Sequence, residues 1–552
     1  MRVFKSFVFW NQLFSLLMIV TAGILGWQLY TLDVLPGNIQ IPVLTCLGLV
    51  CLIVILVKFE FSLSPKIMVG AFAVSVILTA VFGTGSYYLY RTSGTLSAIT
   101  AVKKTSNNKV SLIVPVDSSI ETPEDIAGKR VGVLKNIDKG GTEQALTQLE
   151  KRTDAQYELV ELDSVPQEVL SLYTGEVDAI VLNEAYRTNV MELEGYEDFS
   201  DRTRVLFQAS FKTDATNEAL AVSDVTTRPY NILISGNDTY GDVGELSRSD
   251  VNMIVTINPV TSTVLLTSIP RDSYVPVDCG DAYACAQGQL DKITHTGING
   301  ITSTKQTLEQ LLDIDINYTF RVNFSSVTNI VDSLGGIDIE VPEGQAVETF
   351  YADSTLEGVT EGRNHLDGER ALAFARERYA YIDGDNQRVR NQQMVLKAIF
   401  DKATSPEIIV NYPNLLQALE SAFDTTLTQD EITNFIKYQI QARPGWKFES
   451  YQLSGEGAML FCPSLGQEAY VTVPDPNTTA LAHDKIMAVL DGKDADTVTE
   501  PQSAAQQDEI HQETVSVDDV YDGQGYYGVD SGYYDPSQWS QPEQAYSEEY
   551  PD

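Results

Sequence analysis

The chain has 552 residues, with 37 lysines and arginines against 76 aspartates and glutamates, which gives a formal net charge of −39. This length is enough for three or four domains of ordinary size. An acidic excess of this kind argues against a general nucleic-acid-binding protein, because such proteins neutralise phosphates with clustered lysine and arginine. Five cysteines exclude a disulfide-dense secreted scaffold, and no CxxC pair has the spacing of a zinc site.

Three long apolar runs come first in the chain. No charged residue occurs within residues 7–32, 34–57 or 67–90. Each run is long enough to cross a bilayer as a helix, so residues 1–91 are predicted to form three transmembrane helices. A cleaved signal peptide is the alternative for the first run, but it lacks a small-residue cleavage site and two further runs follow.

The positive charges beside these runs predict the orientation. Arg2, Lys5, Lys58 and Lys66 lie at the ends expected on one side, whereas the short link around Asp33 carries no lysine or arginine. Cytoplasmic loops are typically enriched in these residues. We therefore expect a multi-pass protein of the cell membrane with a cytoplasmic N-terminus and its large C-terminal part outside.

An α/β domain is expected at residues 103–227. Strand-like runs at 110–114, 130–134 and 177–182 alternate with helix-like stretches such as 141–153. This alternation predicts a small accessory domain with parallel strands.

The local text of this domain resembles half of a periplasmic-type solute-binding domain. The resemblance is carried by TPEDIAGKRVGV at 122–133 and GEVDAIV at 175–181. It implies a sensor of a small ligand or glycan. The alternative is a spacer that kept the fold and lost the ligand.

A second α/β domain is predicted at residues 228–405. Its expected strands are 231–235, 251–257, 264–269, 318–322 and 337–341, and its expected helices are 304–312, 325–334, 369–375 and 386–402. Asp367 is a plausible N-cap for the third of these helices. The outline is an α/β/α sandwich, which residues 406–493 are expected to extend.

The C-terminal segment has a different composition. After Lys493 the chain contains no lysine or arginine and is rich in Gln, Ser, Tyr, Gly and acidic residues. Such a segment cannot bury enough apolar area to offset the entropy lost on ordering. Residues 494–552 are therefore predicted to be a disordered acidic tail.

Arginines gather in the second domain beside predicted strand and helix ends. They are Arg248, Arg271, Arg376, Arg378, Arg388 and Arg390, and several have an aspartate within a few residues. Guanidinium groups suit phosphate or pyrophosphate, and carboxylates among them suit Mg²⁺. On a strand Arg376 and Arg378 would point the same way, and on a helix Arg388 and Gln392 would share a face. The alternative is a set of surface ion pairs that contribute little.

These residues lie in text that resembles the LytR-CpsA-Psr family. The matching segments are NILISGND (231–238), SRSD (247–250), SIPRD (268–272), KITH (292–295), VDSLGGI (331–337), LDGERALAFARER (366–378) and RVRNQQ (388–393). Three apolar runs followed by an extra α/β domain resemble the capsule-locus branch of the family.

The resemblance implies an extracytoplasmic phosphotransferase of the Gram-positive envelope. Such an enzyme moves a glycopolymer, here expected to be capsular polysaccharide, from a polyprenyl pyrophosphate carrier to a peptidoglycan sugar hydroxyl through a phosphodiester. Mg²⁺ is the implied cofactor, and capsule-assembly proteins are expected partners. The alternative function is a non-catalytic membrane regulator or scaffold that binds the lipid-linked glycan. A transcription factor is opposed by the predicted topology, and nucleic acid is not an expected partner.

The family pattern also assigns roles to residues of this sequence. The implied catalytic residues are Arg271, Asp272, Arg376 and Arg378, with Asp272 a candidate orienting group or base. The implied pyrophosphate- and lipid-binding residues are Arg248, Arg271, Arg376, Arg378, Arg388 and Gln392. Asp238 and Asp250 match the metal-associated carboxylates.

Several other residues have two interpretations. His295 is either a contact for the acceptor or a structural hydrogen-bonding group. The apolar residues Leu308, Leu311, Leu312, Ile330, Val331 and Leu334 are either walls of a slot for the prenyl chain or ordinary core. Cys279 and Cys285, in an insertion unlike the family core, either form a local disulfide or stay free.

Overall fold

The structure is a computed structural model. It describes residues 2–60, 64–100, 105–191, 193, 195–214, 217–240, 243–280, 287–403, 418 and 422–501. Most of the predicted acidic tail, from residue 502, lies outside the described residues.

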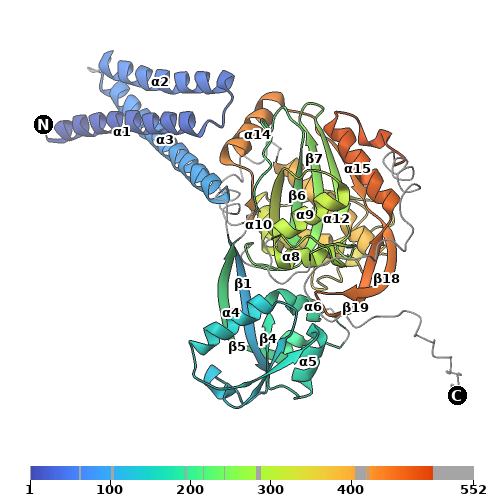
Figure 1. The fold of residues 1–552 in the computed structure, drawn as a ribbon. Coiled ribbons are helices and arrows are strands. Elements are labelled where there is room, and N and C mark those ends of the chain that lie inside the picture. The colour runs from blue at the N-terminus through green and yellow to red at the C-terminus, as the bar shows by residue number, and fades with distance from the viewer. Residues whose placement is uncertain are drawn as a thin grey trace, which may run out of the picture. The chain divides into compact units, whose positions relative to one another are not determined.

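The three apolar runs form the helices α1 (Arg2–Leu32), α2 (Gly37–Glu60) and α3 (Pro65–Ile99) (Figure 1). All three are long and apolar enough to span a membrane. They pack through a small apolar cluster that includes Met18, Cys51 and Phe82. The predicted membrane anchor is confirmed, and α3 continues eight residues past the expected boundary at residue 91.

The accessory domain has a five-stranded sheet in the order β3-β2-β4-β1-β5. The strands are β1 (Thr105–Pro115), β2 (Arg130–Leu134), β3 (Glu158–Leu162), β4 (Ala179–Asn183) and β5 (Thr203–Asp214). The helical segments are η1 (Pro123–Ile126), α4 (Lys139–Glu150), α5 (Val165–Tyr173), η2 (Glu184–Tyr186), α6 (Arg187–Met191) and α7 (Phe199–Arg202). Strands β2 and β4 are parallel, as predicted, and β3, which the sequence analysis did not identify, is parallel to β2.

The prediction of parallel strands is wrong for β1, which runs antiparallel to both β4 and β5. An apolar run such as 110–114 carries no information about direction. Strand direction depends on the pairing partners, and the main partner of β1 is β5, which follows about 90 residues later in the chain.

The second domain is built on a six-stranded sheet in the order β16-β11-β6-β7-β8-β17. The strands are β6 (Tyr230–Asn237), β7 (Ser249–Asn258), β8 (Thr263–Ile269), β11 (Tyr318–Asn323), β16 (Asp424–Thr425) and β17 (Lys447–Gln452). Strands β6, β8, β11 and β17 run in one direction, and β7 and β16 run in the other.

Helices cover both faces of this sheet, which confirms the expected sandwich. The helical segments are η3 (Ile293–His295), α8 (Thr296–Asn299), α9 (Ile301–Leu312), α10 (Phe324–Ser333), α11 (Gly368–Arg376), α12 (Asp385–Ala403), α14 (Gln429–Ala442), α15 (Pro476–Leu490) and η4 (Ala495–Thr497). Paired strands outside the sheet are β9 (Tyr274–Pro276) with β10 (Leu290–Lys292), β12 (Ile337–Val341) with β15 (Gly362–Leu366), β13 (Val347–Thr349) with β14 (Glu357–Val359), and β18 (Gly455–Cys462) with β19 (Gln467–Pro474).

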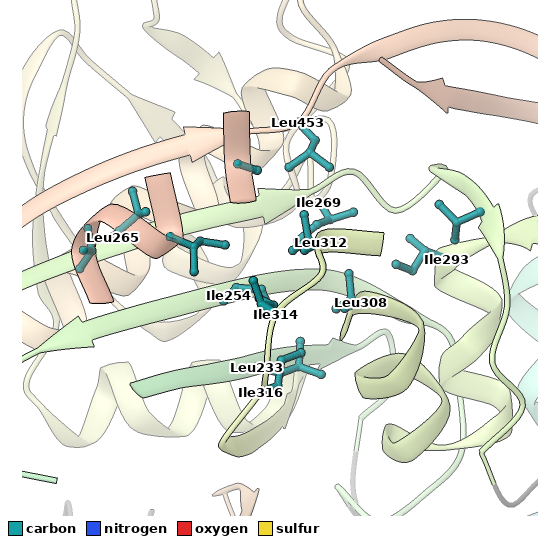
Figure 2. Close-up of a cluster of buried hydrophobic side chains, with 14 of the residues drawn as sticks. Leu233, Ile254, Leu265, Ile269, Ile293, Leu308, Leu312, Ile314, Ile316 and Leu453 are labelled. Atoms are coloured by element: carbon teal, nitrogen blue, oxygen red, sulfur yellow. The ribbon is translucent and has the colours of Figure 1, made fainter. Parts of the chain in front are cut away.

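One face of the sheet packs into a dense core (Figure 2). Leu233, Ile254 and Leu265 point from β6, β7 and β8 towards α9 and α15. Successive residues of a strand point to opposite faces, so their sequence neighbours must face the other layer. Leu308 and Leu312 of α9 belong to this core, which confirms that these two leucines are ordinary core residues and not walls of a prenyl slot.

The segment after α12 contributes strands to the six-stranded sheet itself. Strands β16 and β17 are its two edge strands. The predicted start of the tail at residue 494 is wrong by several residues, because the chain continues to pack after Lys493. Ala495 is buried in the same core as α15, and this burial keeps the segment on the domain.

Candidate active site

Four predicted site residues meet at one end of the inner strands β6, β7 and β8 of the six-stranded sheet. Asp238 directly follows β6, and Arg271 lies two residues after β8. Arg248 and Asp250 lie at the start of β7. Because β7 runs antiparallel to both neighbours, its first residues lie beside the last residues of β6 and β8. The strand order therefore brings together residues that are more than 30 positions apart.

These four side chains form a buried ion-pair network. Arg248 Nη2 and Nε lie 2.7 Å and 3.0 Å from Asp238 Oδ2. The same Nη2 lies 3.6 Å from Asp250 Oδ2, which also accepts a hydrogen bond from Arg271 Nη1 at 2.9 Å. Thr294 Oγ1 donates to the other oxygen of Asp250 at 2.8 Å. With Arg248 only 3 % exposed, the network is not a set of surface pairs.

Asp250 is held in its ionised form. Burial by itself raises the pKa of this carboxyl, but the guanidinium groups of Arg248, Arg271 and Arg388 lower it by more. The hydrogen bond from Thr294 acts in the same direction. The net result is a pKa well below the usual value, so Asp250 is a fixed negative charge at neutral pH.

Arg388 adds a further buried cation. It lies in the first turn of α12, where the helix dipole also favours an anion. Its Nη2 lies 2.7 Å from Asp385 Oδ1, but its Nε is buried without a hydrogen-bond acceptor among the described residues. Burial lowers the pKa of Arg388 and the charges of Arg271 and Arg378 lower it further, whereas Asp385 and Asp250 raise it, and the net change is a lowering. A buried, still charged guanidinium whose Nε–H has no acceptor among the described residues is suited to an incoming anion.

Arg376 and Arg378 lie on the rim of the site. Arg376 is the last residue of α11 and not part of a strand, so the strand geometry considered for the pair does not apply. Its guanidinium carbon lies 4.4 Å from the centre of the Phe324 ring, and that of Arg378 lies 4.5 Å from the Tyr379 ring. These contacts leave the guanidinium groups beside the cavity described below.

Glu377, between these two arginines, was not identified from the sequence. It is fully buried and accepts hydrogen bonds from the backbone N–H groups of Tyr351, Ala352 and Ala380. These bonds fix the end of α11 and the turn after it, which carry Arg376 and Arg378. The signal in the sequence was an acidic residue between two arginines. The local pattern alone does not show that this residue is buried and accepts backbone hydrogen bonds.

Behind the arginines lies a long cavity of about 1000 Å³. Its charged end is lined by Asp238, Arg248, Asp250, Arg271, Arg376, Arg378, Arg388 and Gln392. Away from this charged end its walls are mainly apolar, with Glu431 of α14 as an exception. They come from α10, α12, α14 and the sheet face opposite the dense core. The sheet residues include Ile232, Ile234, Met253, Val255, Val264 and Leu266. The cavity therefore fits an amphiphile with a phosphorylated head and a long apolar chain.

The alternation of side chains along the strands explains why the cavity is apolar. Ile232 and Ile234 face the cavity, whereas Leu233 between them faces the dense core. The helices on the cavity side add Ile330, Leu334 and Ile399. Two of the proposed slot residues, Ile330 and Leu334, thus line this space, and Val331 packs in a separate core.

Two predicted site residues lie differently from the rest. Gln392 shares the helix face of Arg388, as expected, and donates from Nε2 to the Ala375 carbonyl at 3.3 Å. Asp272 does not line the cavity. Its Oδ1 accepts a hydrogen bond from Lys292 Nζ at 2.9 Å, and its Oδ2 lies 3.6 Å from Arg271 Nε. Asp272 is therefore placed to orient Arg271.

His295 has a structural position. Its Nδ1 lies 2.7 Å from Asp291 Oδ1, and its Nε2 lies 3.1 Å from Asn189 Nδ2. The ring is buried, so these contacts account for both nitrogens. Cys279 is bonded in a disulfide, whereas Cys285 lies outside the described residues, so the predicted pairing of the two stays a prediction. Cys462 is buried and free.

Asp238 and Asp250 are the candidate ligands for Mg²⁺. Asp238 Oδ2 and Asp250 Oδ2 lie 2.7 Å and 3.6 Å from the same nitrogen of Arg248, so both carboxylates face one cationic group. Mg²⁺ typically takes one or two carboxylates and completes its octahedron with phosphate oxygens and water. Two carboxylates are therefore ligands of the type that this ion takes.

Family models match two segments of the chain. The LytR_cpsA_psr family matches residues 200–475, which is half of the chain. The family described as NMT1/THI5 like matches residues 80–224, which include the accessory domain.

Several known proteins are similar to the chain. A protein of Bacillus cereus (strain AH820) named polyisoprenyl-teichoic acid–peptidoglycan teichoic acid transferase TagU is 32 % identical over 229 residues, which cover 41 % of this chain and 70 % of the relative. The protein of the same name from Bacillus licheniformis is 29 % identical over 233 residues, 42 % of this chain and 70 % of the relative. A crystal structure of B. subtilis TagT matches with 25 % identity and a TM-score of 0.39, covering 50 % of this chain and 98 % of that one. The extent of the family match and the identity to these relatives show that the chain belongs to the LytR_cpsA_psr family.

Proposed function

We propose that this protein transfers a glycopolymer from a polyprenyl pyrophosphate carrier to a peptidoglycan sugar hydroxyl through a phosphodiester. The observation that carries the proposal is that five arginines and many apolar side chains line the same cavity. A pyrophosphate needs the arginines, and a prenyl chain needs the cavity. Each methylene that the cavity removes from water contributes about 0.8 kcal/mol to binding.

The cationic groups divide between two tasks. Arg248, Arg271 and Arg388 are buried and neutralise the non-bridging oxygens of the pyrophosphate. Arg376 and Arg378 on the rim contact the phosphate that carries the glycopolymer. Asp238 and Asp250 would hold Mg²⁺, which supplies further neutralising charge when bound. Asp272 positions Arg271 from outside the cavity.

The reaction needs little covalent work from the protein. The acceptor hydroxyl attacks the phosphorus that carries the glycopolymer, and a new oxygen–phosphorus bond forms. The bond to the second phosphate breaks, so polyprenyl monophosphate leaves and the hydroxyl proton passes to solvent. Phosphoryl transfer of this kind is accelerated mainly by positioning and by charge stabilisation, which the arginine cluster provides.

The proposed topology places the reaction on the outer side of the membrane. Helix α14, whose Phe435 and Ile436 line the cavity, also carries Lys437. Lys437 forms an ion pair with Asp33 in the link between α1 and α2. The absence of lysine and arginine from that link favours an external position for it. The apolar cavity then lies near the membrane surface from which a prenyl chain would enter.

Capsular polysaccharide is the polymer we propose. Its support is the N-terminal arrangement of three spans and an accessory α/β domain, which resembles the capsule-locus branch. The TagU relatives are named for teichoic acid, so the experiment must offer both polymers. Capsule-assembly proteins are the partners that follow from this choice.

The test uses the full chain in lipid nanodiscs. It is mixed with polyprenyl-pyrophosphate-linked capsular or teichoic acid oligomers and with peptidoglycan fragments, in Mg²⁺ or with a chelator. Mass spectrometry should detect a phosphodiester-linked product together with polyprenyl monophosphate. The product should be lost in Arg271→Ala and Asp250→Ala but kept in Arg390→Ala, whose half-exposed guanidinium pairs with Asp383. Tight binding of the donor without product would favour the regulator or scaffold.

A further inference from the structure

A second cavity, of about 810 Å³, lies between the accessory domain and the catalytic domain. It is separate from the apolar cavity, and no step of the proposed transfer uses it. Its volume falls within the range of sites that hold small organic ligands, about 300–1000 Å³.

The accessory domain contributes the carboxyl ends of its parallel strands. Asp138 follows β2, Asp163 follows β3 and Asn183 ends β4, and all three line the cavity. In α/β sheets, ligands bind in the crevice outside these strand ends. A ligand sensor, which is one of the two interpretations of this domain, needs a binding site, and this cavity supplies one. A domain that serves only as a spacer would not need such a cavity.

Asp138 is built firmly into this wall. Its backbone is left-handed, with φ of 46°, and its Oδ1 accepts from the Gly141 N–H at the start of α4 at 3.3 Å. Its Oδ2 accepts from Asn183 Nδ2 at 2.7 Å. A Cβ on residue 141 would lie 2.2 Å from Asp138 Oδ2, so only glycine leaves room for the carboxylate. These contacts place a carboxylate at the cavity in one orientation.

The catalytic domain forms the opposite wall and is attached to the first. Asp291, Phe461 and Ser464 line the cavity from this side. The walls are joined by a hydrogen bond from the Val165 N–H to the Leu465 carbonyl at 3.3 Å, and Ile298 packs into the core of the accessory domain. The cavity is thus a fixed part of the fold and not a gap between unconnected parts.

The chemistry of the lining selects the ligand. The lining contains four acidic residues, Asp138, Glu143, Asp163 and Asp291. Among the lysines and arginines that the structure describes, it contains Lys212 alone. Such a surface repels phosphorylated ligands. The same lining is rich in side-chain amides, which donate and accept hydrogen bonds as sugar hydroxyls require. Phe461, with 51 % of its surface exposed, offers an apolar face against which a sugar ring can stack.

We infer that this cavity binds an uncharged or amino-bearing saccharide of one or two sugar units. Carboxylates and amides accept its hydroxyl hydrogens, a carboxylate pairs with an amino group where one is present, and Phe461 covers one face of a ring. The saccharide could be free or part of a peptidoglycan glycan strand, and the chemistry of recognition is the same.

The test is isothermal titration calorimetry on the full chain in nanodiscs. The probes are glucosamine, the N-acetylglucosamine disaccharide, glucosamine 6-phosphate and soluble uncrosslinked glycan strands. Saturable binding is expected for the first two, and it should be at least tenfold weaker for the phosphorylated sugar. Binding of glycan strands would identify the polymer as the source, and binding of the small sugars alone would identify a free ligand.

Two variants assign the binding to this cavity. Asp138→Asn keeps the shape and the hydrogen-bond acceptor for α4 but loses the acceptor for Asn183 Nδ2, and it should weaken the binding of glucosamine at least tenfold. Phe461→Ala should weaken both small sugars. The matched control is Glu150→Gln at the other end of α4, outside the lining, which should bind as the parent does. Absence of binding by every probe, preference for the phosphorylated sugar, or equal binding by Asp138→Asn and the parent would each overturn the inference. Because the readout is binding, failure of the proposed transfer reaction would leave this result unaffected.

Discussion

Arg271 Nη1 lies 2.9 Å from Asp250 Oδ2, and this contact ties the end of β8 to the start of β7. Arg271 is thereby held beside the apolar cavity, whose charged end its side chain lines. A buried cation held by a fixed carboxylate does not have to reorganise when an anionic headgroup arrives. Such preorganisation is the main source of charge stabilisation in enzyme sites.

Arg271→Lys should lower the transfer rate about 100-fold, because lysine cannot contact two phosphate oxygens with a planar pair of donors. The rate of polyprenyl monophosphate release is the measurement. Arg390→Lys, at a half-exposed ion pair with Asp383, is the control and should retain the parental rate. An unchanged rate in Arg271→Lys would mean that only the positive charge at this position matters.

Asp250→Asn should lower the stability of the protein at neutral pH more than at acidic pH. The folded pKa of Asp250 lies below its unfolded value of 3.8, so the ionised carboxylate stabilises the folded state. This contribution is fully present above about pH 5 and is lost as the pH falls below about 4 towards the folded pKa. The variant has no such contribution to lose.

Thermal unfolding at pH 7 and at pH 3 measures this effect. We expect a deficit of about 3 kcal/mol at pH 7, which is typical of removing one partner of a buried pair, and a smaller deficit at pH 3. Asp401→Asn, which removes an exposed partner of Lys397, should show almost no deficit at either pH. A deficit that is equal at both pH values would contradict the electrostatic explanation.

Ile399→Trp should narrow the apolar cavity and weaken long prenyl donors. Ile399 lies on α12 and lines the cavity, so the larger ring occupies space that a chain would fill. The KM for a long polyprenyl donor should rise about tenfold, whereas a donor with a short prenyl chain should be little affected. Lys397→Trp places the same ring on the exposed face of the same helix and is the matched control. Equal effects on long and short donors would contradict a chain-binding role for the cavity.

His295→Ala should destabilise the fold without altering the charged end of the apolar cavity. Burial raises the pKa of Asp291, but the interaction with His295 and the hydrogen bonds from Ser464 together lower it by more. The removal of His295 therefore takes away part of the compensation of a buried carboxylate. A loss of about 3 kcal/mol corresponds to a melting temperature lower by roughly 5–10 °C. His365→Ala removes an exposed His–Asp pair and should change the melting temperature by about 1 °C. A parental melting temperature in His295→Ala would point to a role outside stability.

Much of the architecture could be predicted because it depends on local pattern. The three apolar runs, the alternating strands of the second domain and the N-cap at Asp367 all appear in the structure where the sequence indicated them. The arginine and aspartate motifs also predicted which side chains would line one charged site. Asp272 and Arg390 lie outside that lining.

The direction of β1 and the position of Arg376 at a helix end could not be predicted in this way. The run 110–114 has the same pattern in a parallel and in an antiparallel pair, so its direction depends on β5. Arg376 and Arg378 alternate as strand residues would, yet Asp367 starts a helix that ends at Arg376.

The amino-acid sequence by itself thus determined the membrane anchor, the two α/β domains and the set of charged residues, because hydrophobic periodicity and residue type are local properties. The two cavities were decided by the tertiary structure alone. A cavity is the space that remains between packed elements, and its walls come from residues far apart in the chain. The period of two along β6, β7 and β8 sends equally apolar residues to the dense core or to the cavity, and only the helices packed on each face determine which is which.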